Sequence, residues 1–93
     1  MSRKPPAPAV FEALVLTEHQ LAQALRAFRK HRALTQREVA TRSALFPKTI
    51  SSLETQPNRA TVNSLFKLLA ALNVELVLRD KAAAAAASAR EEQ

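Results

Sequence analysis

The 93-residue sequence predicts a mainly helical, all-α fold: a bundle of four to five helices followed by one short C-terminal strand. Three observations lead to this fold class. Apolar residues make up 47% of the chain but only four residues are aromatic, so leucine, valine and alanine must build the core, and this composition favours helices. Apolar positions recur at helical spacing, and two helix-starting patterns precede them. Near the C-terminus the pattern changes to strand-like alternation.

The length allows one domain, and the sequence divides around it. Residues 1–16 form an N-terminal arm that is proline-rich at first, and its last part, 10–16, fits either a strand or a helix. We expect the helical domain over 17–73 and a dimerising strand over 74–81. Residues 82–93, which contain six consecutive alanines, are expected to form a disordered tail.

A first helix is predicted from Thr17 to about His31. Thr17 and Gln20 have the spacing of a capping box, in which each side chain bonds to the backbone of the other residue. Apolar residues then follow on one face and basic residues on the other, namely Leu21, Leu25 and Phe28 against Arg26, Arg29, Lys30 and Arg32.

Two short helices joined by a tight turn are predicted next. Thr35 and Glu38 form a second capping box, and the helix they start should end near Ser43. Pro47 opens the following helix, because proline is tolerated at a first helical position, and this helix runs to about Glu54. An apolar ladder would pack the two helices together: Val39, Ala40, Leu45, Ile50 and Leu53.

A fourth helix is predicted from about Thr61, with a buried face that repeats at helical spacing. This face would consist of Val62, Leu65, Leu69 and Leu72. Val74, Leu76 and Leu78 then alternate with other residues in a strand pattern. Because one strand has no sheet to join within the chain, we expect it to pair with the same strand of a second copy.

The charge of the chain indicates a polyanionic partner. The formal net charge is +6, and nine basic residues face two acidic ones between residues 26 and 67. A helix-turn-helix on so basic a chain predicts binding to double-stranded DNA.

No cysteine is present and no segment is long and apolar enough to span a membrane, so we expect a cytoplasmic protein without membrane partners.

The stretch "TQREVATRSALFPKTISSLE" resembles the Xre/Cro-type helix-turn-helix of phage repressors and bacterial antitoxins. The matching positions are Gln36, Ala40, Thr49-Ile50-Ser51 and Leu53-Glu54. The resemblance continues through "NRATVNSLFKLLAALNVELVLRDK" and is closest to HipB-like antitoxins, whose helical domain also ends in a short strand. It implies a lambda-repressor-like bundle with the strand paired across a dimer.

The resemblance also implies roles for individual residues. Base edges would be contacted by Lys48, Thr49 and Ser52, and phosphates by Gln36, Arg37, Ser51 and Arg59. Ala44 stands where the family usually has glycine, and a left-handed alanine costs about 1–2 kcal/mol, which favours a slightly reshaped turn. Phe46 and Pro47 stand where the family often has polar residues, so the reading of bases shifts toward Lys48, Thr49 and Ser52.

HipB-like antitoxins further imply the partners. They act as homodimers on an inverted-repeat operator, repress their own operon and neutralise a HipA-like serine/threonine kinase toxin. Neither a cofactor nor a metal is expected, and His19 and His31 are isolated, so no catalytic residue is predicted. Two other interpretations fit the residues: a stand-alone Xre-family regulator without a toxin, and a protein-interaction module whose basic face serves solubility.

Overall fold

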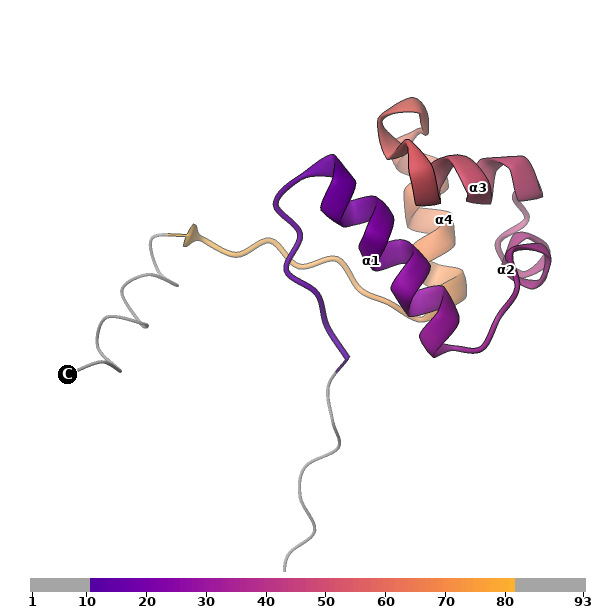
Figure 1. Ribbon diagram of the computed structural model, residues 1–93, viewed down its shortest axis with the longest axis horizontal. Helices are drawn as coiled ribbons and strands as arrows, with labels where there is room; N and C mark the ends of the chain where they lie inside the picture. The colour runs from indigo at the N-terminus through magenta and orange to yellow at the C-terminus, as the bar shows by residue number, and fades with distance from the viewer. Residues whose placement is uncertain (1–10, 82–93) are drawn as a thin grey trace, which may run out of the picture.

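The computed structural model describes residues 11–81, which form a bundle of helices with two extended segments (Figure 1). This architecture confirms the predicted all-α fold. Residues 1–10 of the predicted arm and the predicted disordered tail, 82–93, lie outside the described residues. In the described part, four α-helices and one 3-10 helix follow in order: α1 Glu18–His31, α2 Gln36–Ser43, α3 Pro47–Thr55, η1 Pro57–Arg59 and α4 Val62–Leu72.

The helices begin where the capping residues predict. In the full capping box of α2, Glu38 N donates to Thr35 Oγ1 and Thr35 N donates to Glu38 Oε1, both at 3.0 Å. Thr17 caps α1 by accepting from Gln20 N, but Gln20 Oε1 accepts from Leu16 N instead of Thr17 N. In this first capping box, the hydrogen bond to the Gln20 side chain therefore comes from the residue before the N-cap.

Three helices end in the same way, although the chain contains no glycine. The residue after the last turn is left-handed in each case, with φ near 57°, and its successor donates a backbone hydrogen bond five residues back. The left-handed residues are Ala33, Ala44 and Asn73. Because Ala44 has φ 58° and ψ 33°, the expectation of a reshaped turn was wrong: the alanine adopts the strained conformation.

The apolar residues that follow these three turns stabilise them. Leu34, Leu45 and Val74 are partly buried and pack against the core. Such a contact often accompanies this type of helix ending, because it fixes the direction in which the chain leaves the helix. Packing therefore offsets the backbone strain at the two alanines.

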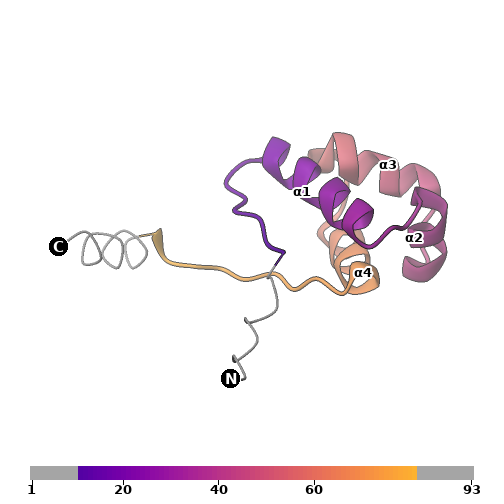
Figure 2. The ribbon, with the colours of Figure 1, turned by 60° about the horizontal axis from the view of Figure 1, so that its bottom comes forward.

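The core lies where α1, α2 and α4 pack against α3 and where α2 packs against α4 (Figure 2). Its most deeply buried side chains come from three helices: Val39, Ile50, Leu53, Leu68 and Leu72. The predicted buried face of α4 was wrong at its first residue, since Val62 is 67% exposed, whereas Leu68 is fully buried. Val62 occupies the first turn of α4, where the 3.6-residue spacing holds but the core does not reach.

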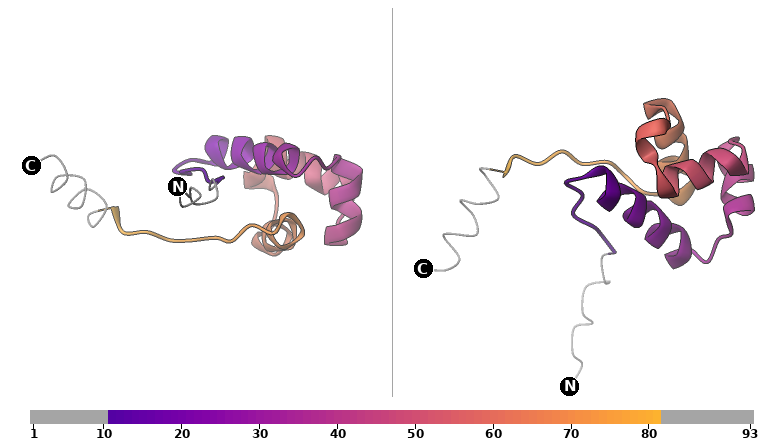
Figure 3. Two further views of the ribbon diagram at one scale, coloured as in Figure 1. Left: turned by 90° about the horizontal axis from the view of Figure 1, so that it is seen from below. Right: turned by 45° about the horizontal axis from the view of Figure 1, so that its top comes forward.

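The two extended segments, 11–16 and 74–80, lie on the side of the bundle away from α2 (Figures 1 and 3). Residues 11–16 form neither a helix nor a strand. Phe11 packs edge-on against Phe28 and stacks on His31, so this segment runs back along α1. Residues 74–80 carry no regular structure in the single chain, and their pairing with a second copy stays a prediction.

Candidate nucleic-acid interface

The polar side of α3 is formed by the residues predicted to meet DNA. Lys48 is exposed, and Thr49, Ser51 and Ser52 are half-buried. They alternate with Ile50 and Leu53, which face the core, so one helix displays the three predicted base-contacting residues and one phosphate-contacting residue together. Thr55 continues the polar side, its hydroxyl donating to the carbonyl of Ser51 at 2.7 Å.

The first turn of α3 is left open to an incoming group. Phe46 occupies the N-cap position without a side-chain hydrogen bond to the helix, and the first turn contains no acidic residue. Pro47 starts the helix and Lys48 follows it. The positive end of the helix dipole is therefore not neutralised by the protein's own side chains, which favours an anionic partner at this end.

The first turn of α2 carries Gln36 and Arg37, both predicted to contact phosphates. Arg37 is exposed and Gln36 is half-buried. Their backbone N–H groups lie in the first turn, where a helix offers no carbonyl partner. The capping box takes up Glu38 N, so a phosphate at this end would meet the remaining amides and the Arg37 charge.

The capping box also sets the charge state of its acid. The hydrogen bond from Thr35 N holds the pKa of the Glu38 carboxyl below its usual value of 4.5, aided by the Thr35 hydroxyl and the charge of Arg42. Glu38 is thus ionised at neutral pH next to the positive end of α2.

An ion pair beneath this surface joins α1 to α3. Arg29 Nε donates to Glu54 Oε2 at 2.6 Å and Arg29 Nη2 donates to Glu54 Oε1 at 3.0 Å, with only 12% and 2% of the two side chains exposed. Arg29 Nη1 also donates to the carbonyl of Leu34 at 2.8 Å. The placement of Arg29 on an exposed basic face was therefore wrong, because its charge is used inside the protein.

Gln36 takes part in the same network. Its Nε2 donates to Glu54 Oε1 at 3.2 Å, which ties the start of α2 to the end of α3. A residue expected to contact DNA thus also supports the geometry of the two helices in the free chain.

The Arg29–Glu54 pair was missed, although the sequence contains a signal for it. Glu54 stands four residues after Ile50, and Arg29 stands four residues after Leu25, so both charged residues share a helix face with the core. A carboxylate on a buried face needs a cation, and Arg29 occupies the matching place on α1.

Arg59, the remaining residue predicted to contact phosphates, is exposed and lies in η1, directly after α3. Arg32, by contrast, binds within the protein. Its Nε donates to the carbonyl of Leu72 at 2.9 Å and its Nη2 to that of Asn73 at 3.3 Å. These bonds join the ends of α1 and α4 and fix where the 74–80 segment leaves the bundle.

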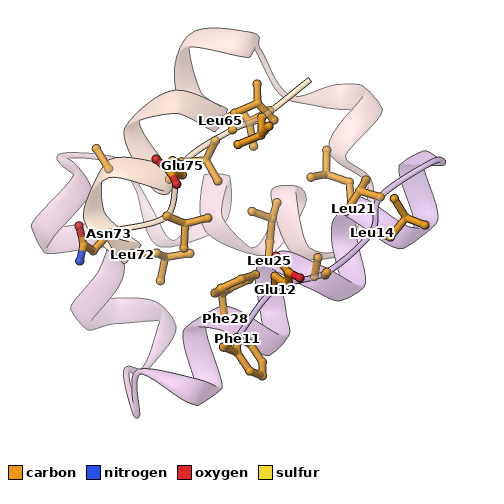
Figure 4. Close-up of a pocket in the computed structure, with 18 of the residues that line it drawn as sticks. Phe11, Glu12, Leu14, Leu21, Leu25, Phe28, Leu65, Leu72, Asn73 and Glu75 are labelled. Carbon is orange, nitrogen blue, oxygen red and sulfur yellow. The ribbon is translucent and has the colours of Figure 1, made fainter. Parts of the chain in front are cut away.

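An open apolar groove of about 1080 Å³ lies between this segment, α1, α4 and residues 11–16 (Figure 4). Leucines from four parts of the chain line it, among them Leu14, Leu21, Leu65 and Leu76. Several of its side chains remain largely exposed, with Leu14 at 76% and Leu78 at 91%.

Between residues 11 and 81, no helix has the length and apolar character to cross a membrane, and no cluster of His, Cys, Asp or Glu could hold a metal.

The chain resembles known proteins over most of the described part. Residues 25–78 match the helix-turn-helix family. Antitoxin HipB of Escherichia coli (strain K12) is 34% identical over 61 residues, which span 66% of this chain and 69% of that protein. Antitoxin HipB of Escherichia coli O6:H1 is also 34% identical over 61 residues, which span 65% of its length.

Solved structures give the same result at the level of the fold. A HipB–O4 20mer complex superposes with a TM-score of 0.71 at 30% identity, over 75% of this chain and 99% of that chain. A HipA–HipB–O2–O3 complex gives a TM-score of 0.70 at 30% identity, with the same coverage. The chain therefore belongs to the helix-turn-helix family and, within it, to the HipB antitoxins.

Proposed function

We propose that this chain is a sequence-specific DNA-binding repressor and the antitoxin of a HipBA-like toxin–antitoxin module. The observation that carries this proposal is the polar first turn of α3, which has no side-chain cap and no acidic residue and carries the exposed Lys48. An α-helix presented in this way fits the major groove, and the neighbouring positive charges suit the phosphates. The similarity to HipB in complex with a 20mer supports the same function.

The residues divide by chemistry into two groups. Lys48, Thr49 and Ser52 are assigned to base edges: lysine donates to guanine O6 or N7, and the threonine methyl contacts the thymine methyl. The phosphates are assigned to the side chains of Gln36, Arg37, Ser51 and Arg59 and to the first-turn amides of α2, those of Gln36 and Arg37.

The active unit is proposed to be a homodimer formed through the apolar groove and the 74–81 segment. Val74, Leu76 and Leu78 would pair with the same residues of a second copy and cover the exposed leucines. A two-fold dimer would place two recognition helices about 34–36 Å apart, one turn of B-DNA, and so select an inverted repeat.

The protein partner is proposed to be a HipA-like serine/threonine kinase toxin, which the chain neutralises while it represses its own operon. The similarity to HipB in a HipA–HipB–O2–O3 complex supports this assignment. The chain itself is proposed to have no catalytic role and to act in the cytoplasm, at the nucleoid when bound to DNA.

DNA binding is tested by fluorescence anisotropy with the fragment upstream of the chain's own gene and a scrambled fragment. We expect at least hundredfold preference for the upstream fragment at physiological salt, since specific binding exceeds non-specific binding by roughly 10³ or more. Lys48→Ala should lose discrimination at one base pair, at a cost of roughly 1–3 kcal/mol. Equal affinity for both fragments would instead favour an interaction module.

Gln36→Ala is the matched variant for a phosphate contact. It should weaken binding to both fragments by a similar factor, because a phosphate contact carries no sequence information. Because Gln36 also bonds to Glu54, the thermal midpoint of the free variant must be measured beside its affinity. If Gln36→Ala keeps full affinity for DNA, Gln36 is not one of the residues that contact a phosphate.

The toxin assignment is tested with the gene neighbour. A kinase-like reading frame beside this gene, whose product binds the chain and loses kinase activity in the complex, would fit an antitoxin. A chain that binds its operator but neither binds nor inhibits that kinase would be a stand-alone regulator.

A further inference from the structure

One apolar side chain stands out on the proposed DNA-binding surface. Phe46 is 79% exposed, and over residues 35–59 it is the only large apolar side chain that is mostly exposed. The other exposed apolar side chains lie on the 11–16 segment, on α4 and on the 74–78 segment. Phe46 is therefore separate from the apolar groove, and dimerisation through that groove leaves its exposure unexplained.

The backbone holds Phe46 in a fixed place. Its φ of −77° and ψ of 148° are extended, as the residue before a proline requires, and Pro47 restricts the next residue too. The carbonyl of Phe46 accepts from Thr49 N at 2.9 Å and from Ile50 N at 3.2 Å. The ring thus projects from a rigid helix start, so that little backbone entropy is lost when it meets a partner.

The surroundings of Phe46 favour a polyanion over an apolar protein surface. Phe46 caps the positive end of the α3 dipole without neutralising it, and Lys48 lies two residues further along. No acidic residue lies in the first turn. In the major groove, the apolar group that a phenylalanine can contact is the C5-methyl of thymine.

We propose that Phe46 is a specificity-determining residue that reads a thymine methyl group in each half-site. This inference rests on the proposed DNA-binding function and adds an apolar contact to the hydrogen bonds assigned to Lys48 and Ser52. Phe46 stands where the family often has a polar residue, and it cannot form a hydrogen bond to a base. An apolar contact gives this position a role in reading the sequence. The ring distinguishes thymine from cytosine or uracil by the methyl group alone.

The experiment uses deoxyuridine, which differs from thymidine only by the missing C5-methyl. Full-length chain first enriches a duplex from a random-sequence library, and each thymine of the enriched site is then replaced singly by deoxyuridine. Affinities are measured for the wild type and Phe46→Ala, with circular dichroism to verify folding. We expect one position per half-site at which the wild type loses about fourfold, the effect of one buried methyl group, and Phe46→Ala loses nothing.

Two control variants separate this ring from other apolar groups. Thr55→Ser removes a methyl group from α3 and keeps the hydroxyl that bonds to Ser51, and Val62→Ala shortens a side chain that is 67% exposed on α4. Both should keep the methyl dependence at the Phe46 position. If either variant also loses it, the contact does not belong to Phe46.

The remaining outcomes are equally decisive. If the wild type is insensitive to every replacement, or Phe46→Ala keeps the wild-type dependence, the inference is wrong although DNA binding stands. If Phe46→Ala binds DNA normally but loses a protein partner, the ring belongs to a protein interface and the inference is also wrong. If the library yields no enriched sequence, the proposed function itself fails.

Discussion

Two alanines hold backbone conformations that glycine adopts more easily. Ala33 and Ala44 follow α1 and α2 with φ of 57° and 58°. The left-handed region brings the Cβ atom too close to the following carbonyl oxygen, at a cost of about 1–2 kcal/mol. The fold accepts this strain because the leucine after each alanine packs against the core.

Ala44→Gly should therefore stabilise the domain by about 1 kcal/mol, the strain released minus the extra backbone entropy of glycine. Urea unfolding at pH 7 would measure the change in the free energy of unfolding. Ala27→Gly is the matched control, since this exposed alanine lies inside α1 and should instead lose about 0.5–1 kcal/mol. Destabilisation by Ala44→Gly would contradict the left-handed turn.

Glu38 makes the stability depend on pH in the acidic range. Because the pKa of Glu38 is lowered in the folded state, its ionised carboxylate stabilises the fold, and this contribution is fully present at pH values above the ordinary pKa of 4.5. That contribution disappears as the pH falls through the folded-state pKa. The free energy of unfolding of the wild type should thus exceed that of Glu38→Gln by a constant amount above pH 5, and this difference should shrink below pH 4.5. Urea unfolding from pH 3 to 7 measures it, and a margin independent of pH would exclude this role.

At the scale of elements, the Arg29–Glu54 pair determines how α1, α2 and α3 meet. It connects α1 to the last turn of α3, and Gln36 adds the first turn of α2 to the same carboxylate. The orientation of α3 therefore depends on Arg29 and Glu54, to which no DNA contact is assigned, and on Gln36, which is also proposed to bind a phosphate. Their contribution is to position the surface residues above them.

Arg29→Met should cost about 3–5 kcal/mol in the free energy of unfolding, because it leaves the Glu54 carboxylate buried without a cation. Arg29→Met combined with Glu54→Leu should recover most of this loss, since an apolar pair of similar size avoids burying a charge. Denaturant titrations of wild type, both single variants and the double variant provide the test. Strictly additive losses would show that the two residues do not act as a pair.

The starts of the helices could be predicted from local chemistry, but the packing of the helices against one another could be predicted only in part. Thr35 and Glu38 are three residues apart, so their bonds are visible in the sequence, and α2 begins as expected. Periodicity alone placed Val62 in the core and overlooked Leu68, because spacing defines a helix face but not which neighbours cover it. Likewise, Arg29 and Glu54 are 25 residues apart, and their contact depends on the tertiary arrangement.

The same limit applies to the candidate site. The four α3 residues Lys48, Thr49, Ser51 and Ser52 do share the polar side of one helix, because helical spacing fixes that relation. The sequence could not indicate that Gln36 is bonded to Glu54, nor that the ring of Phe46 is the most exposed large apolar group of the helix-turn-helix. Both properties follow from how α2 and α3 pack.

At the scale of the whole molecule, the two proposed interfaces occupy different parts of the surface. The residues proposed to bind DNA lie on α2, α3 and η1, and the apolar groove lies between α1, α4 and the two extended segments (Figure 1). Changes in one region should therefore leave the other intact. This separation allows dimerisation and DNA recognition to be tested independently.

Leu76→Ser combined with Leu78→Ser should yield monomers, because each chain loses two exposed leucines whose burial contributes about 1.5–3 kcal/mol apiece. Sedimentation velocity at micromolar concentration would measure the change, and the monomer should bind a single half-site as weakly as the full inverted repeat. Phe66→Ser, at a half-exposed position of α4 outside the groove lining, should remain dimeric. A dimer that survives the double substitution would rule out pairing through this segment.

The absence of glycine after α1 and α2 has a consequence for the lifetime of the protein in a cell. Each strained alanine lowers the free energy of unfolding by about 1 kcal/mol, which raises the unfolded fraction roughly fivefold. Together, Ala33 and Ala44 raise it about thirtyfold. A protease that cleaves only opened chains works in proportion to that fraction. Ala33 and Ala44, the latter only two residues before Phe46, would thus raise the rate at which such a protease removes this protein.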